Sequence, residues 1–115
     1  MRPIVRRLAD LEEFRNSCGF HRDLLSAADC AAVSVAIVRI DRAERHHHQR
    51  SIEIYYVLEG EGTIELDGEE ITLGPRTLVM IPPGVRHRAD GRMNVLVISV
   101  PAFNLADQIP ADDDI

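Results

Sequence analysis

Residues 46–60 read HHHQRSIEIYYVLEG, and this stretch decides how the rest of the chain is interpreted. His46 and His48 are two residues apart, so both imidazoles leave the same face of an extended strand. Glu53 opens the apolar, β-rich run that follows, and His87 offers a fourth donor far downstream. Imidazole and carboxylate together suit a divalent transition metal. The stretch therefore predicts a metal site on a β-scaffold.

The identity of the histidine ligands depends on the register of this strand. In a regular strand His47 points away from His46 and His48 and is solvated. A β-bulge near Arg45 would shift the register by one residue and present His47 instead. A solvated surface run is the alternative for the whole triplet, although its position between two strand-like segments excludes a terminal tag.

The spacing resembles the two sequence motifs of the cupin superfamily. The matching positions are His46, His48, Glu53 and Gly60 in the first motif, and Pro82, Gly84 and His87 in the second. The resemblance covers residues 31–100 and is that of a small single-domain cupin. It implies an all-β jelly-roll barrel or sandwich in which the three histidines and the glutamate bind one metal.

Turn signals divide the rest of the chain into short elements. Asp10 and Glu13 form a capping-box pattern, and Gly19 suits a helix end, so a short helix is predicted over 11–18. Asp67-Gly68 predicts a type I′ hairpin turn. Strands are expected over 20–25, 31–40, 52–58, 63–66, 70–73, 77–81 and 93–100, with 52–58 and 63–66 paired across 59–62 and a turn at 90–91. This pattern is typical of an antiparallel sandwich or barrel.

The chain is expected to form one domain. Residues 1–30 would supply a helix and a strand packed on the barrel, 31–100 the barrel, and 101–115 a tail. The resemblance implies that this tail folds back over the barrel, as many small cupins end. The like-charged run Asp112–Asp114 is expected to be a frayed, solvated end.

Composition excludes several classes of function. A net charge of −6 without a basic cluster argues against a nucleic-acid partner. The apolar runs fall well short of the ~18 residues that a membrane span needs. The N-terminus lacks a signal-peptide h-region, so a cytoplasmic protein is expected. All thirteen basic residues are arginine, which excludes lysine Schiff-base chemistry. Cys18 and Cys30 are expected to be reduced, small apolar side chains, with a disulfide as the alternative.

Alternation from Glu53 places Tyr55 and Val57 on the ligand face of their strand. Tyr55 is therefore a candidate acid or hydrogen-bond donor, and a core aromatic is the alternative. Arg39, on the strand that leads to the histidines, is a candidate for binding a substrate carboxylate, with simple solvent exposure as the alternative. His21 is expected to make an ordinary polar contact rather than to ligate a metal.

Four protein ligands leave up to two positions open on an octahedral iron, manganese, nickel or zinc ion. A redox metal would support dioxygenation of a small diol, thiol or diketone. Manganese, nickel or zinc would polarise a carbonyl for isomerisation or decarboxylation. The prediction is a metal-dependent enzyme acting on a small polar molecule, either a dioxygenase or a sugar-type isomerase. A non-catalytic sensor or sugar-binding module is the alternative.

The outward side of the strand after Glu53 predicts an assembly. Ile54, Tyr56 and Leu58 form an apolar row that a single short helix covers only in part. Because soluble monomers rarely expose such patches, a homodimer with Tyr56 at its interface is expected. The alternative is that the helix or the tail covers this row within one chain.

Overall fold

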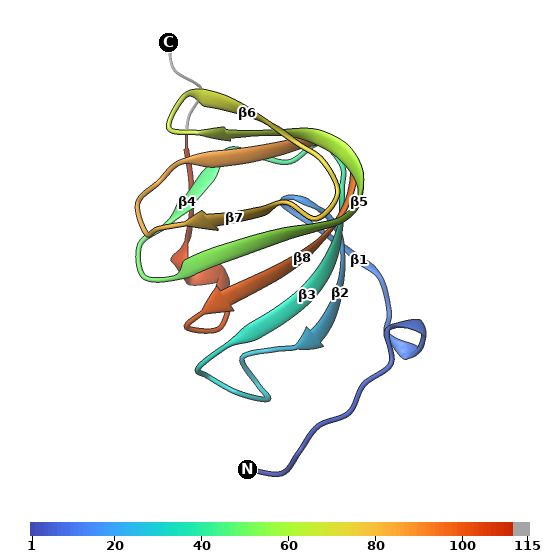
Figure 1. Cartoon of the computed structure of the whole chain (residues 1–115). Helices are drawn as coiled ribbons and strands as arrows, with labels where there is room; N and C mark the ends of the chain where they lie inside the picture. The colour runs from blue at the N-terminus through green and yellow to red at the C-terminus, as the bar shows by residue number, and fades with distance from the viewer. Residues whose placement is uncertain (112–115) are drawn as a thin grey trace.

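Within residues 1–111, alternating and β-branched runs form nine antiparallel strands, which curl into a half-open barrel in the computed structural model (Figure 1). The structure describes residues 1–111, so the expected frayed end at Asp112–Asp114 lies outside the described residues. The elements are η1 (Leu8–Asp10), β1 (Phe14–Asn16), β2 (Gly19–Leu25), β3 (Ser34–Ile40), β4 (His46–His48), β5 (Ile52–Leu66), β6 (Glu69–Leu73), β7 (Leu78–Ile81), β8 (His87–Val100), η2 (Leu105–Asp107) and β9 (Gln108–Pro110). The predicted all-β, cupin-like barrel is confirmed.

Two long strands, β5 and β8, are the frame of this barrel. They pair antiparallel along their whole length. The sheet runs in the order β1-β2-β3-β8-β4-β9, and β5, which pairs with β8, also pairs with β6 and β7. The predicted hairpin at 59–62 and turn at 90–91 are wrong, because both segments continue as strand. Gly62 lies opposite Gly91, and a Cβ on Gly91 would stand 2.5 Å from the Cα of Gly62. The glycines there allow close approach of two bent strands, not chain reversal.

The chain reversal at Asp67-Gly68 is confirmed. Both residues have positive φ, at 47° and 89°, as a type I′ turn requires. The other predicted strands are also present, and the one expected over 31–40 begins later, at Ser34.

The predicted N-terminal helix is wrong: η1 is a single 3-10 turn, and residues 11–18 form β1 and the start of a hairpin. Tertiary contacts override the capping pattern. The ring of Phe14 stacks on His21, with 5.6 Å between ring centroids. Glu13 accepts a hydrogen bond from Arg39 at 3.0 Å instead of capping a helix. The segment therefore extends the sheet that forms one wall of the barrel.

Side chains of β5 alternate between the barrel interior and its outer face. Tyr55 and Val57 are buried, at 1% and 0% exposure, whereas Leu58 on the other face is 44% exposed. This confirms the inward register that starts at Glu53 and places the glutamate on the interior wall. No helix in the described part of the chain is long and apolar enough to cross a membrane.

Candidate metal centre

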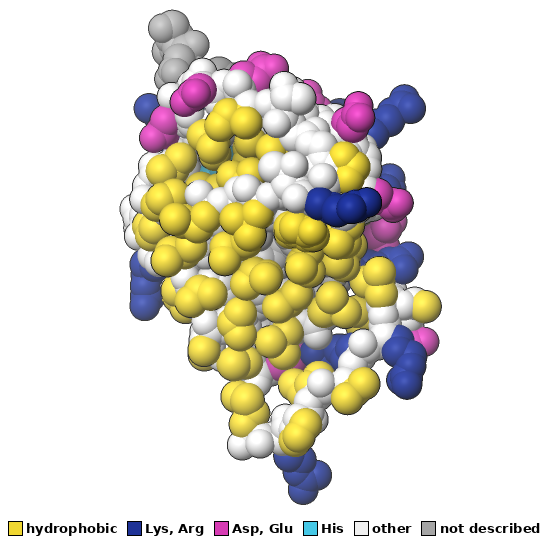
Figure 2. Space-filling model, in the orientation of Figure 1, with side chains coloured by type: hydrophobic (Ala, Val, Ile, Leu, Met, Phe, Trp, Pro, Cys, Tyr) yellow, Lys and Arg dark blue, Asp and Glu magenta, His cyan; other side chains and the backbone are white. Residues whose placement is uncertain are grey.

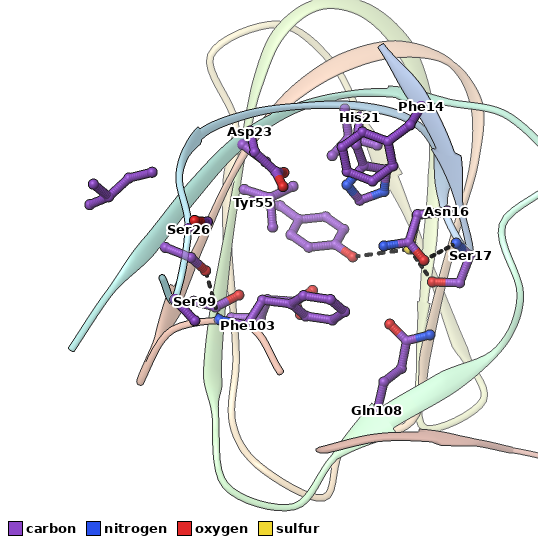
Figure 3. Close-up of a pocket in the computed structure, with 18 of the residues that line it drawn as sticks. Phe14, Asn16, Ser17, His21, Asp23, Ser26, Tyr55, Ser99, Phe103 and Gln108 are labelled. Atoms are coloured by element: carbon purple, nitrogen blue, oxygen red, sulfur yellow. Dashed lines mark hydrogen bonds between the residues drawn. The ribbon is translucent and has the colours of Figure 1, made fainter. Parts of the chain in front are cut away.

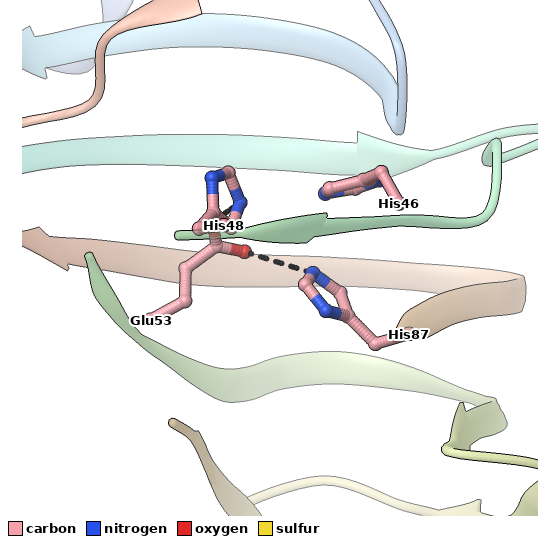
Figure 4. Close-up of side chains that lie close together, drawn as sticks. All are labelled: His46, His48, Glu53 and His87. Atoms are coloured by element: carbon pink, nitrogen blue, oxygen red, sulfur yellow. Dashed lines mark ion pairs between the residues drawn. The ribbon is translucent and has the colours of Figure 1, made fainter. Parts of the chain in front are cut away.

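Three strands bring the four candidate ligands together inside the barrel (Figure 4). His46 and His48 come from β4, Glu53 from the start of β5 and His87 from the start of β8. All four are buried, and one ligand atom from each lies within 4.8 Å of the others. The antiparallel pairing of His46 with His87 sets two of the imidazoles side by side. Residues that are far apart in sequence thus converge on one point.

His47 is left out of this group. It occupies the middle of β4 and pairs with Ile109 of β9, on the face opposite to that of His46 and His48. Its side chain is half-buried rather than fully solvated. The regular strand therefore presents the first and third histidines to the interior, as the unbulged register predicts.

Backbone carbonyls hold two of the imidazole rings. The Nδ1 of His46 lies 2.9 Å from the carbonyl oxygen of Glu44, and the Nδ1 of His87 lies 3.0 Å from that of Val85. Only a protonated nitrogen can donate to a carbonyl, so the hydrogen is on Nδ1 and the lone pair is on Nε2. Contacts of this kind orient metal-binding histidines.

The contacts between histidines and Glu53 fit a shared cation. Nε2 of His48 lies 2.5 Å from Oε2 of Glu53, and Nε2 of His87 lies 3.5 Å from Oε1. Yet within the described residues neither Nε2 has a hydrogen-bond partner with acceptable geometry, although both atoms are buried. Donor atoms that crowd together without aligning as hydrogen bonds point at a common centre. The donor set of three imidazoles and one carboxylate suits a divalent transition metal.

The charges within the cluster are unequal. Burial opposes ionisation of Glu53, but its contacts with His48 and His87 outweigh burial and lower its pKa. Burial likewise opposes protonation of His48, but the close contact with the Glu53 carboxylate raises the pKa of that imidazole overall. Burial, followed by the neighbouring His87, lowers the pKa of His46 to about 4. Without a metal, these shifts favour the ionised carboxylate and the neutral form of His46, and they make His48 the imidazole that protonates most readily.

Metal affinity is expected to fall as the pH falls, about tenfold per pH unit once His48 is protonated. The metal must displace this proton, because only a neutral imidazole ligates. The raised pKa of His48 places the onset above the ordinary imidazole value of about 6.5, whereas His46 contributes only near pH 4. Zn²⁺ competition titrations between pH 5 and 8 measure the slope. Affinity that changes only near pH 4 would contradict a histidine-dominated site.

His46 and Glu53 also line a cavity of about 190 Å³ inside the barrel (Figure 3). Tyr55 lies on the wall of the same cavity, 1% exposed, with its hydroxyl oxygen 3.9 Å from Sγ of Cys18. Burial, then the charges of Cys18 and Glu53, raise the pKa of Tyr55 well above its usual value. Its phenol therefore remains a neutral hydrogen-bond donor near the metal candidates.

The structure does not bring Arg39 to this cluster. Its side chain lies on the outer face of β3, 52% exposed, bonded to Glu13 and stacked over the ring of Phe20 at 4.3 Å. The carboxylate-binding role expected for it therefore does not enter the function proposed below. Cys18 and Cys30 are both free, as expected. Burial, followed by the charge of Glu53, raises the pKa of Cys18 to about 11, so its thiol remains protonated.

Asp107 holds the loop between two of the candidate metal ligands. No sequence motif indicates this role. Its buried carboxylate accepts hydrogen bonds from three successive backbone N–H groups, those of Gln49, Arg50 and Ser51, at 3.1–3.3 Å. These residues form the loop that joins His48 to the strand carrying Glu53. Asp107 thereby fixes the relative position of two candidate ligands, His48 and Glu53. A sequence pattern cannot show this contact, because it spans more than fifty residues.

Replacing Asp107 by alanine is expected to lower the free energy of unfolding of the metal-free protein by about 2–4 kcal/mol, because three backbone donors lose a charged acceptor. Zn²⁺ affinity should fall about 10- to 100-fold, as for other groups that orient ligands. Urea unfolding and Zn²⁺ competition measure the two effects. Asp107→Asn, which keeps one acceptor, should give intermediate values. Unchanged Zn²⁺ affinity in Asp107→Ala would show that the loop does not set the ligand geometry.

Comparison with known proteins agrees with this geometry. The model of the cupin domain family matches residues 38–100, and the chain belongs to the cupin family. The polyketide synthase CurC of Streptomyces cyaneus is 38% identical over 93 residues, which are 76% of this chain and 60% of that protein. Quercetin 2,3-dioxygenase of Bacillus subtilis is 38% identical over 66 residues, 55% of this chain and 20% of that protein. This chain thus spans less than two thirds of each.

Two solved structures have the same fold. A protein from Planctomyces limnophilus has 32% sequence identity and a TM-score of 0.88, with 94% of this chain and 96% of that chain covered. The nucleoside dehydratase Pac13 has a TM-score of 0.85 at 22% identity, with 96% and 92% covered. At that identity, the second similarity concerns the fold alone.

Proposed function

We propose that this cupin is a metal-dependent dioxygenase of a small diol or diketone. The observation that carries the proposal is the position of His46 and Glu53 at the wall of a mainly apolar cavity of about 190 Å³. Pockets for drug-sized ligands measure about 300–1,000 Å³, so this cavity suits a single small ring or a short chain. The similarity to quercetin 2,3-dioxygenase, a protein named as a dioxygenase, supports this class of reaction.

The residues of the chain have separate roles in this proposal. His46, His48, Glu53 and His87 would hold one iron, manganese, nickel or zinc ion. A bound redox metal supplies dioxygen activation and polarises the substrate oxygens. Tyr55, kept neutral by burial, donates a hydrogen bond to a substrate oxygen. The apolar walls exclude water, which strengthens these electrostatic interactions.

A sugar-type isomerase is less well supported by the cavity. A sugar presents hydroxyl groups on all sides, and each one needs a hydrogen-bond partner when it is buried. Here apolar side chains such as Val38, Val97 and Phe103 supply much of the wall. A planar diol or diketone, with oxygens at one edge and an apolar body, matches this distribution better.

Oxygen consumption tests the proposed reaction. The iron-loaded protein is expected to consume dioxygen when catechol or acetylacetone is added, in proportion to the loss of the added compound. The zinc-loaded protein should bind both compounds without consuming oxygen. Tyr55→Phe should slow turnover and retain the metal. Tight binding without oxygen uptake in the iron-loaded protein would indicate a non-catalytic binding module instead.

We also propose that two copies of the chain form a homodimer through the outer face of β7, β5 and β8. Hydrophobic side chains gather over this face in Figure 2. Within the single chain, Leu78 and Met80 are 59% and 53% exposed, and Leu58 is 44% exposed. Neither the N-terminal segment nor the described part of the tail covers them. A two-fold contact would bury this face against its own copy.

A further inference from the structure

The cavity beside the metal candidates also receives a pair of polar side chains from β2 (Figure 3). His21 and Asp23 are two residues apart, so both point to the interior face of that strand. In the sheet, β3 and β8 separate β2 from β4. The pair therefore faces the cavity from a different part of the wall than the histidines of β4.

His21 is held in place but lacks a polar partner. Phe14 stacks on its ring at an interplanar angle of 28°. Its Nε2 atom is buried and has no hydrogen-bond partner among residues 1–111. Burial lowers the pKa of this imidazole, and the opposing charge of Glu53 does not reverse that shift, so the ring is neutral at neutral pH. A buried, unpaired ring nitrogen is unfavourable unless a ligand completes its hydrogen bond.

Asp23 adds a second polar group without a partner. Asp23 is exposed and lines the cavity, and none of the hydrogen bonds or ion pairs among residues 1–111 uses its carboxylate, which is therefore free to accept a hydrogen bond from a ligand. The pairing of β2 with β3 shifts register between Asp23 and Leu25. Irregularities of this kind re-aim side chains and are frequent beside functional sites.

We propose that His21 and Asp23 bind a hydroxyl group of the substrate at a point remote from its metal-binding oxygens. The wall of the same cavity also includes Phe14, Ala36 and Val97, which offer only apolar contact. The substrate class is then a small aromatic or conjugated compound with adjacent oxygens at one end and a hydroxyl group at the other. This inference rests on the proposed function, since the adjacent oxygens are assigned to the metal.

Two probes of equal size test the hydroxyl contact. 3,4-Dihydroxybenzyl alcohol and 4-ethylcatechol share the catechol group and differ by a hydroxyl in place of a methyl. Calorimetric titration of the zinc-loaded protein, under argon, is expected to show about five- to tenfold tighter binding of the alcohol. In His21→Phe, which keeps a ring beside Phe14, and in Asp23→Ala, which removes the acceptor, this preference should shrink or vanish. Zinc content and 4-ethylcatechol affinity should stay unchanged.

Arg39→Gln, on the outer face of β3, is the matched control and should keep the full preference. Equal binding of both probes by the wild type would overturn this inference and leave the proposed function standing. A preference that persists in both β2 variants would overturn it as well. If neither probe binds the zinc-loaded wild type, the diol proposal fails and the inference fails with it. Asp23→Ala, at an exposed position of β2, keeps the test decisive should His21→Phe not fold.

Discussion

His48→Ala and His87→Ala are each expected to lose the metal that the wild type retains at one ion per chain. Each variant removes one of four donors and leaves a gap in a buried site, where water is a poor substitute for an oriented imidazole. Loss of a group that only orients ligands costs about 10–100-fold in affinity, so loss of a ligand should exceed 100-fold. Elemental analysis after equal loading and gel filtration measures the content.

His47→Ala is the matched control for this experiment. It removes the same side chain from the same strand, but on the face that points away from the cluster. This variant should therefore retain one metal per chain. Equal metal content in wild type, His48→Ala and His87→Ala would end the assignment. Loss in His47→Ala alone would instead show that the strand binds metal in the shifted register.

Metal binding should also stabilise the fold. The four ligands come from three strands, and the unfolded chain cannot hold them together. A chelator should therefore lower the melting temperature of the loaded wild type. The same chelator should have no effect on His48→Ala. This comparison separates removal of the metal from any direct effect of the chelator on the protein.

The sequence predicts the cluster of four candidate ligands because its signals are local. A spacing of two on a strand fixes which face a histidine occupies, and alternation from Glu53 fixes Tyr55 and Val57 inside the barrel. The turn at Asp67-Gly68 is equally local, because positive φ at two adjacent positions is a property of those residues. Such features need no knowledge of what the rest of the chain does.

The errors arise where distant segments decide the outcome. The sequence predicts turns at the glycines at 60, 62 and 91, but these glycines permit the close pairing of β5 and β8. The capping pattern predicts a helix over 11–18, but this segment instead forms a strand that pairs with β2. Pairing with β2 and β8 also fixes the outward direction of Arg39, and the tail's return beside β4 brings Asp107 to its loop. No periodic pattern in the sequence indicates any of these contacts, because most of them join segments that are far apart along the chain.

Tyr56→Glu is expected to convert a homodimer into a monomer of 12.9 kDa. Tyr56 lies on the outer face of β5, paired with Leu78 of β7 and Leu96 of β8, at the middle of the apolar region. Aromatic side chains at the centre of an interface often contribute 2 kcal/mol or more, about 30-fold in affinity. A buried carboxylate would add an unfavourable desolvation free energy.

Light scattering at micromolar concentration measures this change in mass. The substitution should leave the barrel intact, because Tyr56 points away from the core, and an unchanged zinc content would show this. Leu105→Glu is the control: Leu105 is 67% exposed but belongs to η2, so the dimer should persist. A wild-type mass near that of one chain would rule the dimer out. A dimer that tolerates Tyr56→Glu would place its interface elsewhere, because an uncompensated charge cannot remain buried at the centre of an apolar contact.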